Sequence, residues 1–273
     1  MNISDMLTRN GRVFSEDIAL IEPKSGINSR TAINWREFDE NANRFANALR
    51  DRGVSKGDKV IHWMMNSTDW LIAYFGIIRT GAWAVPLNFR FRSQDAEYCA
   101  EIAEAGVMVL GEEFIERVEA ARTRMPLIKD YILAGQNPSG GMESFQDMID
   151  KSPAQPSGVE LALEDCAALY FTSGTTGRPK PILITHRNME SAAVSEVLFH
   201  YQRPEDNFII IPPLYHTGVK MHWFGSLMTG GRATLLSEFS PERLFETVQQ
   251  ERGSIVWIPT AWTYDILAAM DRG

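Results

Sequence analysis

Short apolar runs alternate with longer amphipathic stretches along most of the chain. The predicted strands are "DKVIHWMM" (58–65), "WAVPLN" (83–88), "VMVLG" (107–111) and "YILAG" (131–135). The stretches between them, residues 67–82, 93–106 and 112–125, are predicted helices, and the connections are only a few residues long. Alternation of this kind is typical of parallel strands joined by crossover helices. The sequence therefore predicts an α/β fold with doubly wound, mostly parallel sheets.

The same alternation continues in the second half of the chain. Further strands are predicted at 166–171, 207–213, 232–236 and 254–260, and further helices at 31–53, 222–231, 240–253 and 261–273. Ser67, Ser93 and Ser240 are predicted helix caps, and Pro241 stands at a first helical position that suits proline. Residues 135–158 are rich in Gly, Pro and Ser, and we expect them to form a long surface excursion.

Composition and charge exclude several classes of protein. Of the 273 residues, 44% are hydrophobic and 23% are charged, as in folded soluble proteins rather than disordered ones. The net charge of −8, without a basic stripe, argues against a nucleic-acid partner. The first residues lack the pattern of a signal peptide, and no apolar run reaches 18 residues, so neither secretion nor a membrane span is expected. Cys99 and Cys166 have no CxxC spacing and are interpreted as buried, reduced thiols. We expect a cytoplasmic protein.

One segment that follows an apolar strand is rich in glycines and hydroxyls. The segment "TSGTTGRPK" covers residues 172–180, and its members of interest are Thr172, Ser173, Gly174, Thr175, Thr176, Gly177 and Lys180. Glycines allow close backbone approach to a ligand, and successive backbone N–H groups can bind an anion. The spacing is not that of a Walker A loop or of GxGxxG. Composition alone leaves two readings, a phosphate-binding loop and a hydroxyl-rich surface turn.

"YFTSGTTGRPK" closely resembles the phosphate loop of the adenylate-forming enzymes, the acyl-CoA synthetases and their relatives. "THRN" (185–188), "PPLYHTG" (212–218) and "WIPT" (257–260) resemble later segments of that family, and two earlier segments resemble its N-terminal region. The resemblance covers nearly the whole chain. It implies that a carboxylic acid is activated with ATP and Mg²⁺ to an acyl-adenylate, followed in many members by thioester formation with coenzyme A.

The resemblance also implies roles for individual residues. Thr172 to Gly177 would cradle the β- and γ-phosphates, Thr176 would help to place magnesium, and Lys180 would sit near the triphosphate or brace the loop. His216 would orient the acid or gate its pocket. Pro181 departs from the glycine that is usual in the family; it removes a backbone N–H and puts the role of Lys180 in question.

Two further features of the segment after His216 leave alternatives open. Lys220 either meets a second carboxylate or a polar group of the substrate or, as lysines near helix starts commonly do, points to water. Trp223 and Phe224 are either pocket wall or core. His216 and His222 lack the spacing of a zinc site and no third ligand is apparent, so a structural metal is not expected.

The family's later signatures are absent from the 273 residues, including the Tyr-Gly-x-Thr-Glu segment and the small C-terminal domain with its catalytic lysine. We therefore expect the N-terminal portion of a ligase, inactive alone, with residues 1–54 and 190–273 in one incomplete subdomain and 55–189 in another. An incomplete sheet predicts exposed apolar surface and association of copies into a homo-oligomer. Alternatives are a different acyl acceptor, such as a carrier-protein thiol or a luciferase-like oxidation, and a non-catalytic nucleotide-binding or interaction module. A P-loop kinase fits poorly.

Overall fold

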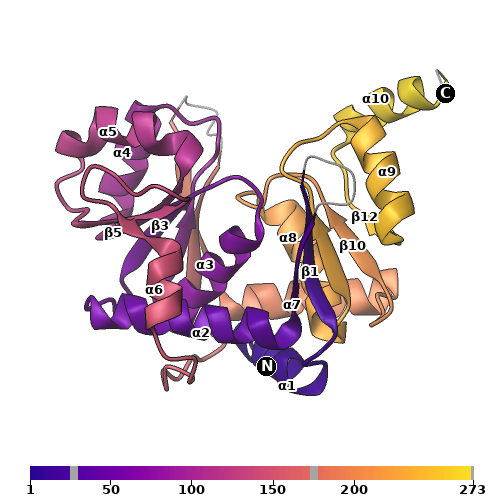
Figure 1. Cartoon of the computed structure of the whole chain (residues 1–273), viewed down its shortest axis with the longest axis horizontal. Helices are drawn as coiled ribbons and strands as arrows, with labels where there is room; N and C mark the ends of the chain where they lie inside the picture. Colours follow the sequence, from indigo (N-terminus) through magenta and orange to yellow (C-terminus); the bar gives the residue numbers. More distant parts are fainter. Residues whose placement is uncertain (25–29, 173–177, 272–273) are drawn as a thin grey trace.

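A seven-stranded sheet forms the first half of the molecule in this computed structural model, which describes residues 1–24, 30–172 and 178–271 (Figure 1). Its strand order is β7-β6-β5-β3-β4-β8-β9, and all neighbours are parallel except β8 and β9. The strands are β3 (Lys59–Trp63), β4 (Trp83–Pro86), β5 (Val107–Gly111), β6 (Asp130–Ala134), β7 (Glu143–Ser144), β8 (Cys166–Thr172) and β9 (Lys180–Thr185).

A five-stranded sheet with the order β12-β10-β11-β1-β2 forms the second half. Its strands are β1 (Ile18–Pro23), β2 (Arg30–Asn34), β10 (Asn207–Ile210), β11 (Arg232–Leu235) and β12 (Ile255–Val256). Only the β1–β2 pair is antiparallel, and β1 lies parallel to β11, so the beginning of the chain joins its last third. The predicted α/β class with mostly parallel sheets is confirmed. The proposed subdomain boundaries stay a prediction.

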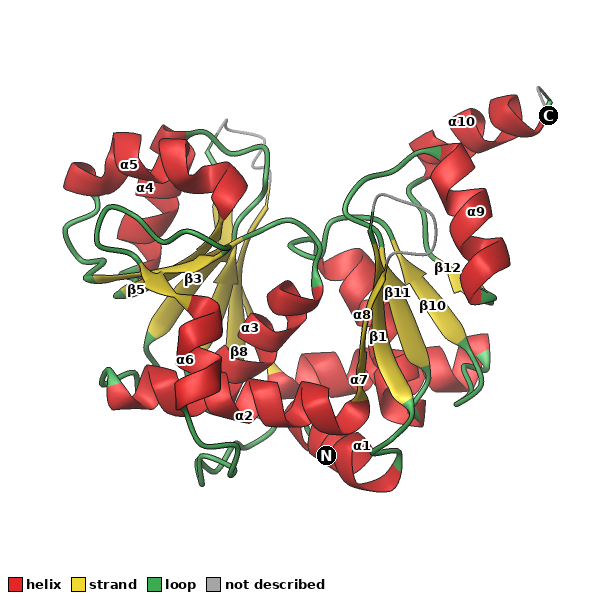
Figure 2. Ribbon diagram, in the orientation of Figure 1, coloured by secondary structure: helices red, strands yellow, loops and turns green. Residues whose placement is uncertain are grey.

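Ten α-helices cover these sheets in the described part of the chain (Figure 2). They are α1 (Ile3–Val13), α2 (Trp35–Asp51), α3 (Thr68–Arg79), α4 (Ser93–Ala103), α5 (Ile115–Ala121), α6 (Phe145–Lys151), α7 (His186–His200), α8 (Thr217–Thr229), α9 (Pro241–Glu251) and α10 (Thr260–Met270). Single 3₁₀ turns at Glu112–Phe114 and Arg122–Arg124 flank α5. No helix of the described ranges is long and apolar enough to cross a bilayer.

Two of the three predicted caps are confirmed. The Ser67 side chain accepts a hydrogen bond from the Trp70 backbone, and Ser240 accepts one from the Arg243 backbone, with Pro241 directly after it. Ser93 is wrong as a cap, because it is already the first residue of α4. The predicted helix at 31–53 begins only at Trp35, after the Asn34 cap, because residues 30–34 pair with β1.

The predicted surface excursion at 135–158 is wrong in its middle, which forms β7 and α6. Phe145, Met148 and Ile149 of α6 are buried, and the Phe145 ring lies 4.7 Å from that of Phe45 on α2. Glycines, prolines and serines flank this short helix, so the average composition of the stretch hides its apolar face. The assignment of both cysteines as buried is also wrong in part: Cys99 is buried, whereas Cys166 is half-buried.

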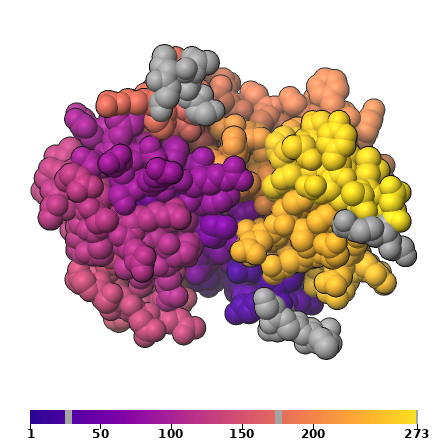
Figure 3. Space-filling view, turned by 90° about the horizontal axis from the view of Figure 1, so that it is seen from above, coloured from indigo at the N-terminus to yellow at the C-terminus, as the bar shows by residue number. Residues whose placement is uncertain are grey.

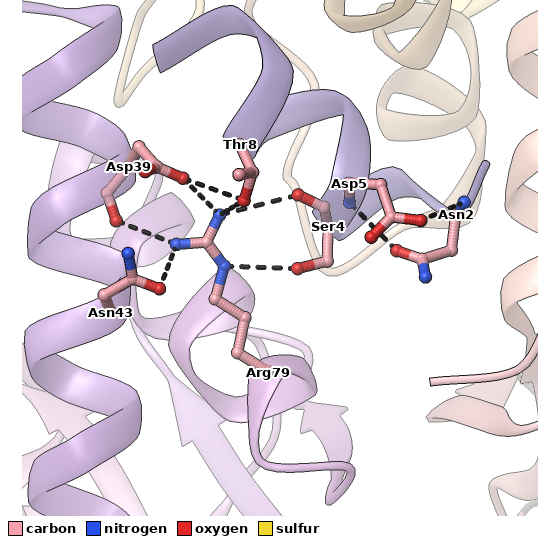
Figure 4. A network of polar contacts seen from close by, with 7 residues as sticks. All are labelled: Asn2, Ser4, Asp5, Thr8, Asp39, Asn43 and Arg79. Atoms are coloured by element: carbon pink, nitrogen blue, oxygen red, sulfur yellow. Dashed lines mark hydrogen bonds and ion pairs between the residues drawn. The ribbon is translucent and has the colours of Figure 1, made fainter. Parts of the chain in front are cut away.

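The two sheets share one hydrophobic core. Helix α3 is buried along its whole length, and its Phe75 ring meets Trp223 of α8 edge-on at 6.3 Å. Trp223 and Phe224 are fully buried members of this core. At the carboxyl end of α3, the guanidinium of Arg79 forms hydrogen bonds with side chains of α1 and α2 (Figure 4). The two halves are therefore packed together rather than loosely linked.

Candidate functional site

The carboxyl ends of the parallel strands of both sheets meet at one edge of the molecule. Asn66, three residues after β3, reaches the segment that follows β10. In open α/β sheets, ligands bind outside the carboxyl ends of the strands. Figure 3 looks onto the molecule from above, with the first half in purple and pink beside the second in orange and yellow, and indigo N-terminal residues visible between them. The candidate site lies along this edge.

Asn66 fixes the segment that carries His216. Its buried amide nitrogen donates to the carbonyls of Ile211 and Pro212 at 3.1 Å and of Leu236 at 3.2 Å, and its oxygen accepts from the Leu214 backbone at 2.8 Å. One side chain that follows β3 thus contacts four backbone groups at the strand ends of the second sheet, and its two N–H donors are shared among three carbonyls. Asn66 was not predicted from the sequence, where its signal is a polar residue soon after a buried strand.

His216 is the N-cap residue of α8, and its backbone N–H donates to the Pro213 carbonyl at 3.0 Å. Its ring lies 4.9 Å from that of Tyr215, which in turn meets Phe89, just after β4, at 5.8 Å. The His216 side chain is exposed, yet partial desolvation by its neighbours lowers its pKa. A neutral imidazole at the edge of the site can accept or donate a hydrogen bond to a carboxylic acid without itself carrying a charge.

The structure describes the residues on either side of the predicted phosphate loop, Thr172 before it and Arg178 to Lys180 after it. Ser173, Gly174, Thr175, Thr176 and Gly177 lie outside them. Thr172 and Lys180 face each other across the antiparallel β8–β9 pair, and both are exposed. The strand that follows the loop segment therefore runs antiparallel to the strand that precedes it.

Pro181 sits on the edge strand β9 opposite Phe171, a place where a sheet tolerates a missing N–H. At the other exit residue, the Arg178 guanidinium lies 5.3 Å from the centre of the Tyr98 ring. These two residues hold the exit of the loop against β8 and α4.

A cavity of about 590 Å³ lies beside this exit, between α4 and Pro179. Its lining includes the carboxylates of Asp95, Glu97 and Glu101 together with the guanidinium groups of Arg124 and Arg178. A triphosphate needs concentrated positive charge, which this mixed lining does not supply. The described part of the lining therefore does not match the positive charge expected of the nucleotide site that the resemblance implies.

Lys220 does not point to water, so that alternative is wrong. It is fully buried, with its Nζ bonded to the Tyr170 hydroxyl and 3.4 Å from the Leu214 carbonyl. The same Nζ lies 4.2 Å, 4.5 Å and 5.0 Å from the ring centres of Tyr74, Tyr170 and Trp70. Burial lowers the pKa of Lys220 well below its usual value, and no carboxylate forms a salt bridge with it among the described residues.

His62 belongs to the same buried cluster. Its ring meets Trp70 edge-on at 4.2 Å, and neither ring nitrogen has a hydrogen-bond partner among the described residues. Burial, and secondarily the charge of Lys220, lowers the pKa of His62 well below its usual value. The cluster thus places two basic side chains in an aromatic environment that disfavours their charged forms.

His222 has two neighbours with metal-ligand atoms that were not predicted from the sequence. Glu196 and His200 of α7 lie beside it, and ligand atoms of the three residues are all within 4.8 Å of one another. Glu196 and His200 are one helical turn apart, which is a signal that the sequence offered. His216 does not belong to this group.

The chain matches the family model described as AMP-binding enzyme over residues 7–272. It is 31% identical over 244 residues to a feruloyl-CoA synthase from Amycolatopsis sp, covering 89% of this chain and 46% of that protein. It is 28% identical over 263 residues to a 3-hydroxybenzoate–CoA/4-hydroxybenzoate–CoA ligase from Thauera aromatica, covering 94% of this chain and 49% of that ligase. The chain thus spans about half the length of these curated relatives.

Among solved structures, the chain resembles the anthranilate CoA ligase AuaEII in complex with anthranoyl-AMP. The TM-score is 0.86 at 26% identity, and the match covers 94% of this chain and 49% of that one. The family match spans the strand ends, Asn66 with its hydrogen bonds to the backbone, and the segment of His216 described above. This chain belongs to the family of AMP-binding enzymes.

Proposed function

We propose that this chain forms the phosphate- and acid-binding part of an AMP-forming acid–thiol ligase. In the proposed reaction, a carboxylate oxygen attacks the α-phosphorus of ATP and pyrophosphate leaves. The sulfur of coenzyme A then attacks the acyl carbonyl, and AMP leaves with the electron pair of the broken bond. The observation that carries the proposal is the set of hydrogen bonds between Asn66 and the backbone at Ile211 and Leu214. They fix the His216 segment at the edge where β8 also ends.

Two described residues frame the proposed nucleotide site. The Thr172 hydroxyl and the Lys180 ammonium are exposed on paired strand positions, so both are accessible to phosphate oxygens. Lys180 would offset the repulsion between the attacking carboxylate and the triphosphate. In our proposal, Ser173, Gly174, Thr175, Thr176 and Gly177 donate to the β- and γ-phosphates. Thr176 would also offer its hydroxyl to Mg²⁺, an ion that neutralises charge between phosphate oxygens.

His216 is the proposed contact for the acid. Because its pKa is lowered, the imidazole is neutral near pH 7 and orients the carboxylate by a hydrogen bond instead of holding it in an ion pair. An ion pair would stabilise the ground-state carboxylate and make it a poorer nucleophile. The neutral imidazole leaves the attacking oxygen reactive.

Because the relatives are about twice as long, we propose that turnover needs a longer protein and that these 273 residues alone are inactive. The acid panel for the longer protein follows from the relatives: ferulate, 3- and 4-hydroxybenzoate and anthranilate. Acid-dependent exchange of pyrophosphate into ATP measures the first step, and thioester formation with coenzyme A or with a carrier-protein thiol distinguishes the acceptor.

The variant test uses Lys180→Ala and His216→Ala in the longer protein. We expect each to lower the exchange rate by roughly 10- to 1000-fold, which is the usual cost of losing one positioned polar group. Lys129→Ala is the matched control, since Lys129 is an exposed lysine just before the amino end of β6. ATP binding without exchange for any acid would contradict the ligase and favour a non-catalytic nucleotide-binding or interaction module.

A further inference from the structure

Three side chains with nitrogen and oxygen donors converge between α7 and α8. Nδ1 of His200 lies 2.7 Å from Oε2 of Glu196, and Nδ1 of His222 lies 2.6 Å from Oε1 of the same carboxylate. Glu196 and His200 share one face of α7 through their i, i+4 spacing. His222 comes from α8, so the cluster joins two helices.

The carboxylate at the centre of this cluster is buried and held in place. Gln202 donates to Oε2 of Glu196 at 3.0 Å and to the His222 carbonyl at 3.0 Å, and its own oxygen accepts from Ser226 at 2.8 Å. The Glu196 residue is only 7% exposed. Gln202, itself held by Ser226 and the His222 carbonyl, therefore helps to fix the rotamer of Glu196 by a hydrogen bond to Oε2, as the outer partners of metal ligands do.

The backbone of α8 is shaped to let the cluster form. At Gly225, a Cβ atom would lie 2.5 Å from the Glu196 Cβ and 2.7 Å from the Gln202 oxygen. A side chain at this position would push α7 away from α8. On the other side, Trp257 stacks on His222 with ring centres 5.5 Å apart and planes at 25°, which fixes the imidazole plane.

We propose that Glu196, His200 and His222 form a binding site for a divalent transition-metal ion, with zinc as the preferred ion. Two imidazoles and one carboxylate are a ligand set that zinc uses in proteins, and nitrogen donors disfavour Mg²⁺ and Ca²⁺. When each imidazole carries its proton on Nε2, both Nδ1 lone pairs and one carboxylate oxygen are free to coordinate. The 60% exposed His200 side chain gives the ion a path from solvent and leaves a coordination position for water.

The proposed site is separate from the magnesium that accompanies ATP, and it does not depend on the ligase proposal. Its ion would tie α7 to α8 by coordinate bonds to both helices. His222 lies six residues after His216 on the same segment, and its neighbour Trp257 follows β12. The ion would therefore also restrain the strand-end segment that carries the proposed acid contact.

Calorimetric titration of the untagged, chelator-treated 273-residue chain with zinc chloride tests the proposal. We expect one ion per chain, and at least a roughly 10-fold weaker affinity in His200→Ala and in Glu196→Gln. His200 is exposed, so its removal leaves the core intact, and circular dichroism of each variant checks folding. His216→Ala and Cys166→Ser are matched controls that remove other candidate ligands, and each should leave the affinity unchanged.

Cobalt provides a second readout, because Co²⁺ bound to nitrogen and carboxylate ligands in place of zinc gives visible absorption bands. We expect these bands in the parent chain and their loss in His200→Ala. Gln202→Leu should weaken binding roughly 10-fold through the misplaced carboxylate. The proposal is overturned if the parent chain binds no zinc at micromolar concentration, or if His200→Ala and Glu196→Gln bind it as tightly as the parent chain.

Discussion

The two halves of the molecule bury their outer sheet faces to very different extents. In the seven-stranded half, α4 and α5 cover the outer face over a large cluster that includes Trp63, Phe114 and Leu133. In the five-stranded half, the outer cluster has four buried members, Ile209, Ile211, Leu236 and Leu244.

Helix α10 shows what this difference means for a single element. It has no buried residue in the described chain. Its Trp262 and Ile266 pack against the outer cluster, and Trp262 stacks on Phe239 at 4.1 Å. Its Tyr264, Leu267 and Met270 are more than half exposed. Apolar composition alone thus does not bury a helix, because burial needs a second surface. The expected association of copies through this region stays a prediction.

The largest effect should come from the Arg79 network, which closes the first half at its border with α1 and α2. The guanidinium lies 2.6 Å from Asp39 and 2.8 Å from Asn43, and its Nε lies 3.1 Å from the Ser4 hydroxyl (Figure 4). Arg79→Met leaves the Asp39 carboxylate largely desolvated and unpaired, so we expect a loss of about 3–5 kcal/mol in the free energy of unfolding. Urea denaturation with an unchanged m-value measures it.

The control for Arg79 is Arg36→Met, which breaks an exposed pair with Glu16. Such pairs contribute little because water screens them, so we expect a loss below about 1 kcal/mol. Equal losses for the two variants would show that burial of the Arg79 network adds nothing.

A matched pair of leucines tests the two regions directly. Leu71 of α3 is fully buried in the shared core, whereas Leu267 of α10 is 53% exposed. Leu71→Ala should cost about 2–5 kcal/mol through lost burial and a cavity, and Leu267→Ala less than about 0.5 kcal/mol. If Leu267→Ala costs as much as Leu71→Ala in thermal and urea unfolding, a surface covers α10 in solution, and sedimentation would then reveal association.

Asp69, at the junction between the halves, has a carboxyl group whose ionised form is disfavoured by burial. Desolvation, and then the charge of Glu22 on β1, raises the pKa of Asp69 to about 6. The folded state therefore holds its proton more tightly than the unfolded state, and stability falls as pH rises from about 4 to about 6. Removing the ionisable group in Asp69→Asn should stabilise the protein by about 3 kcal/mol at pH 8 and should leave its stability unchanged near pH 3.5.

Urea denaturation at the two pH values measures the effect of Asp69→Asn. Asp265→Asn, on the exposed face of α10, is the control and should change stability by less than about 0.5 kcal/mol at either pH. A benefit of Asp69→Asn that persists unchanged at pH 3.5 would exclude ionisation as its cause.

Local patterns in the sequence predicted most elements, because strand and helix periodicity, Ser67 and Ser240 are signals contained in a few residues. The pairing of β1 with β11 joins residues far apart in the sequence, and so does the hydrogen bond from Asn66 to the Pro212 carbonyl. Both depend on how distant segments pack. The same holds for the candidate site residues: a local motif predicts a role for His216, whereas the contact of Glu196 with His222 depends on the packing of α7 on α8.

The smallest expected effect concerns Lys220, which lies where the two halves meet. Burial lowers the pKa of Lys220, so folding is opposed by the loss of the charge that this lysine carries in the unfolded chain. This free-energy cost of folding decreases as pH rises toward the usual lysine pKa, because the unfolded chain then loses the charge as well. The rings of Tyr74 and Trp70 and the Tyr170 hydroxyl offset part of the cost. Lys220→Met, similar in volume, should therefore stabilise the chain by only about 1 kcal/mol at pH 7 and by less at pH 10. Lys129→Met, at an exposed site, should leave the free energy of unfolding unchanged at either pH. A net loss of stability in Lys220→Met at pH 7 would show that the ring and hydroxyl contacts of Lys220 outweigh its desolvation.

The same variant tests whether Lys220 contacts the substrate in the longer protein. An unchanged preference between mono- and dicarboxylic acids in Lys220→Met would exclude such a contact.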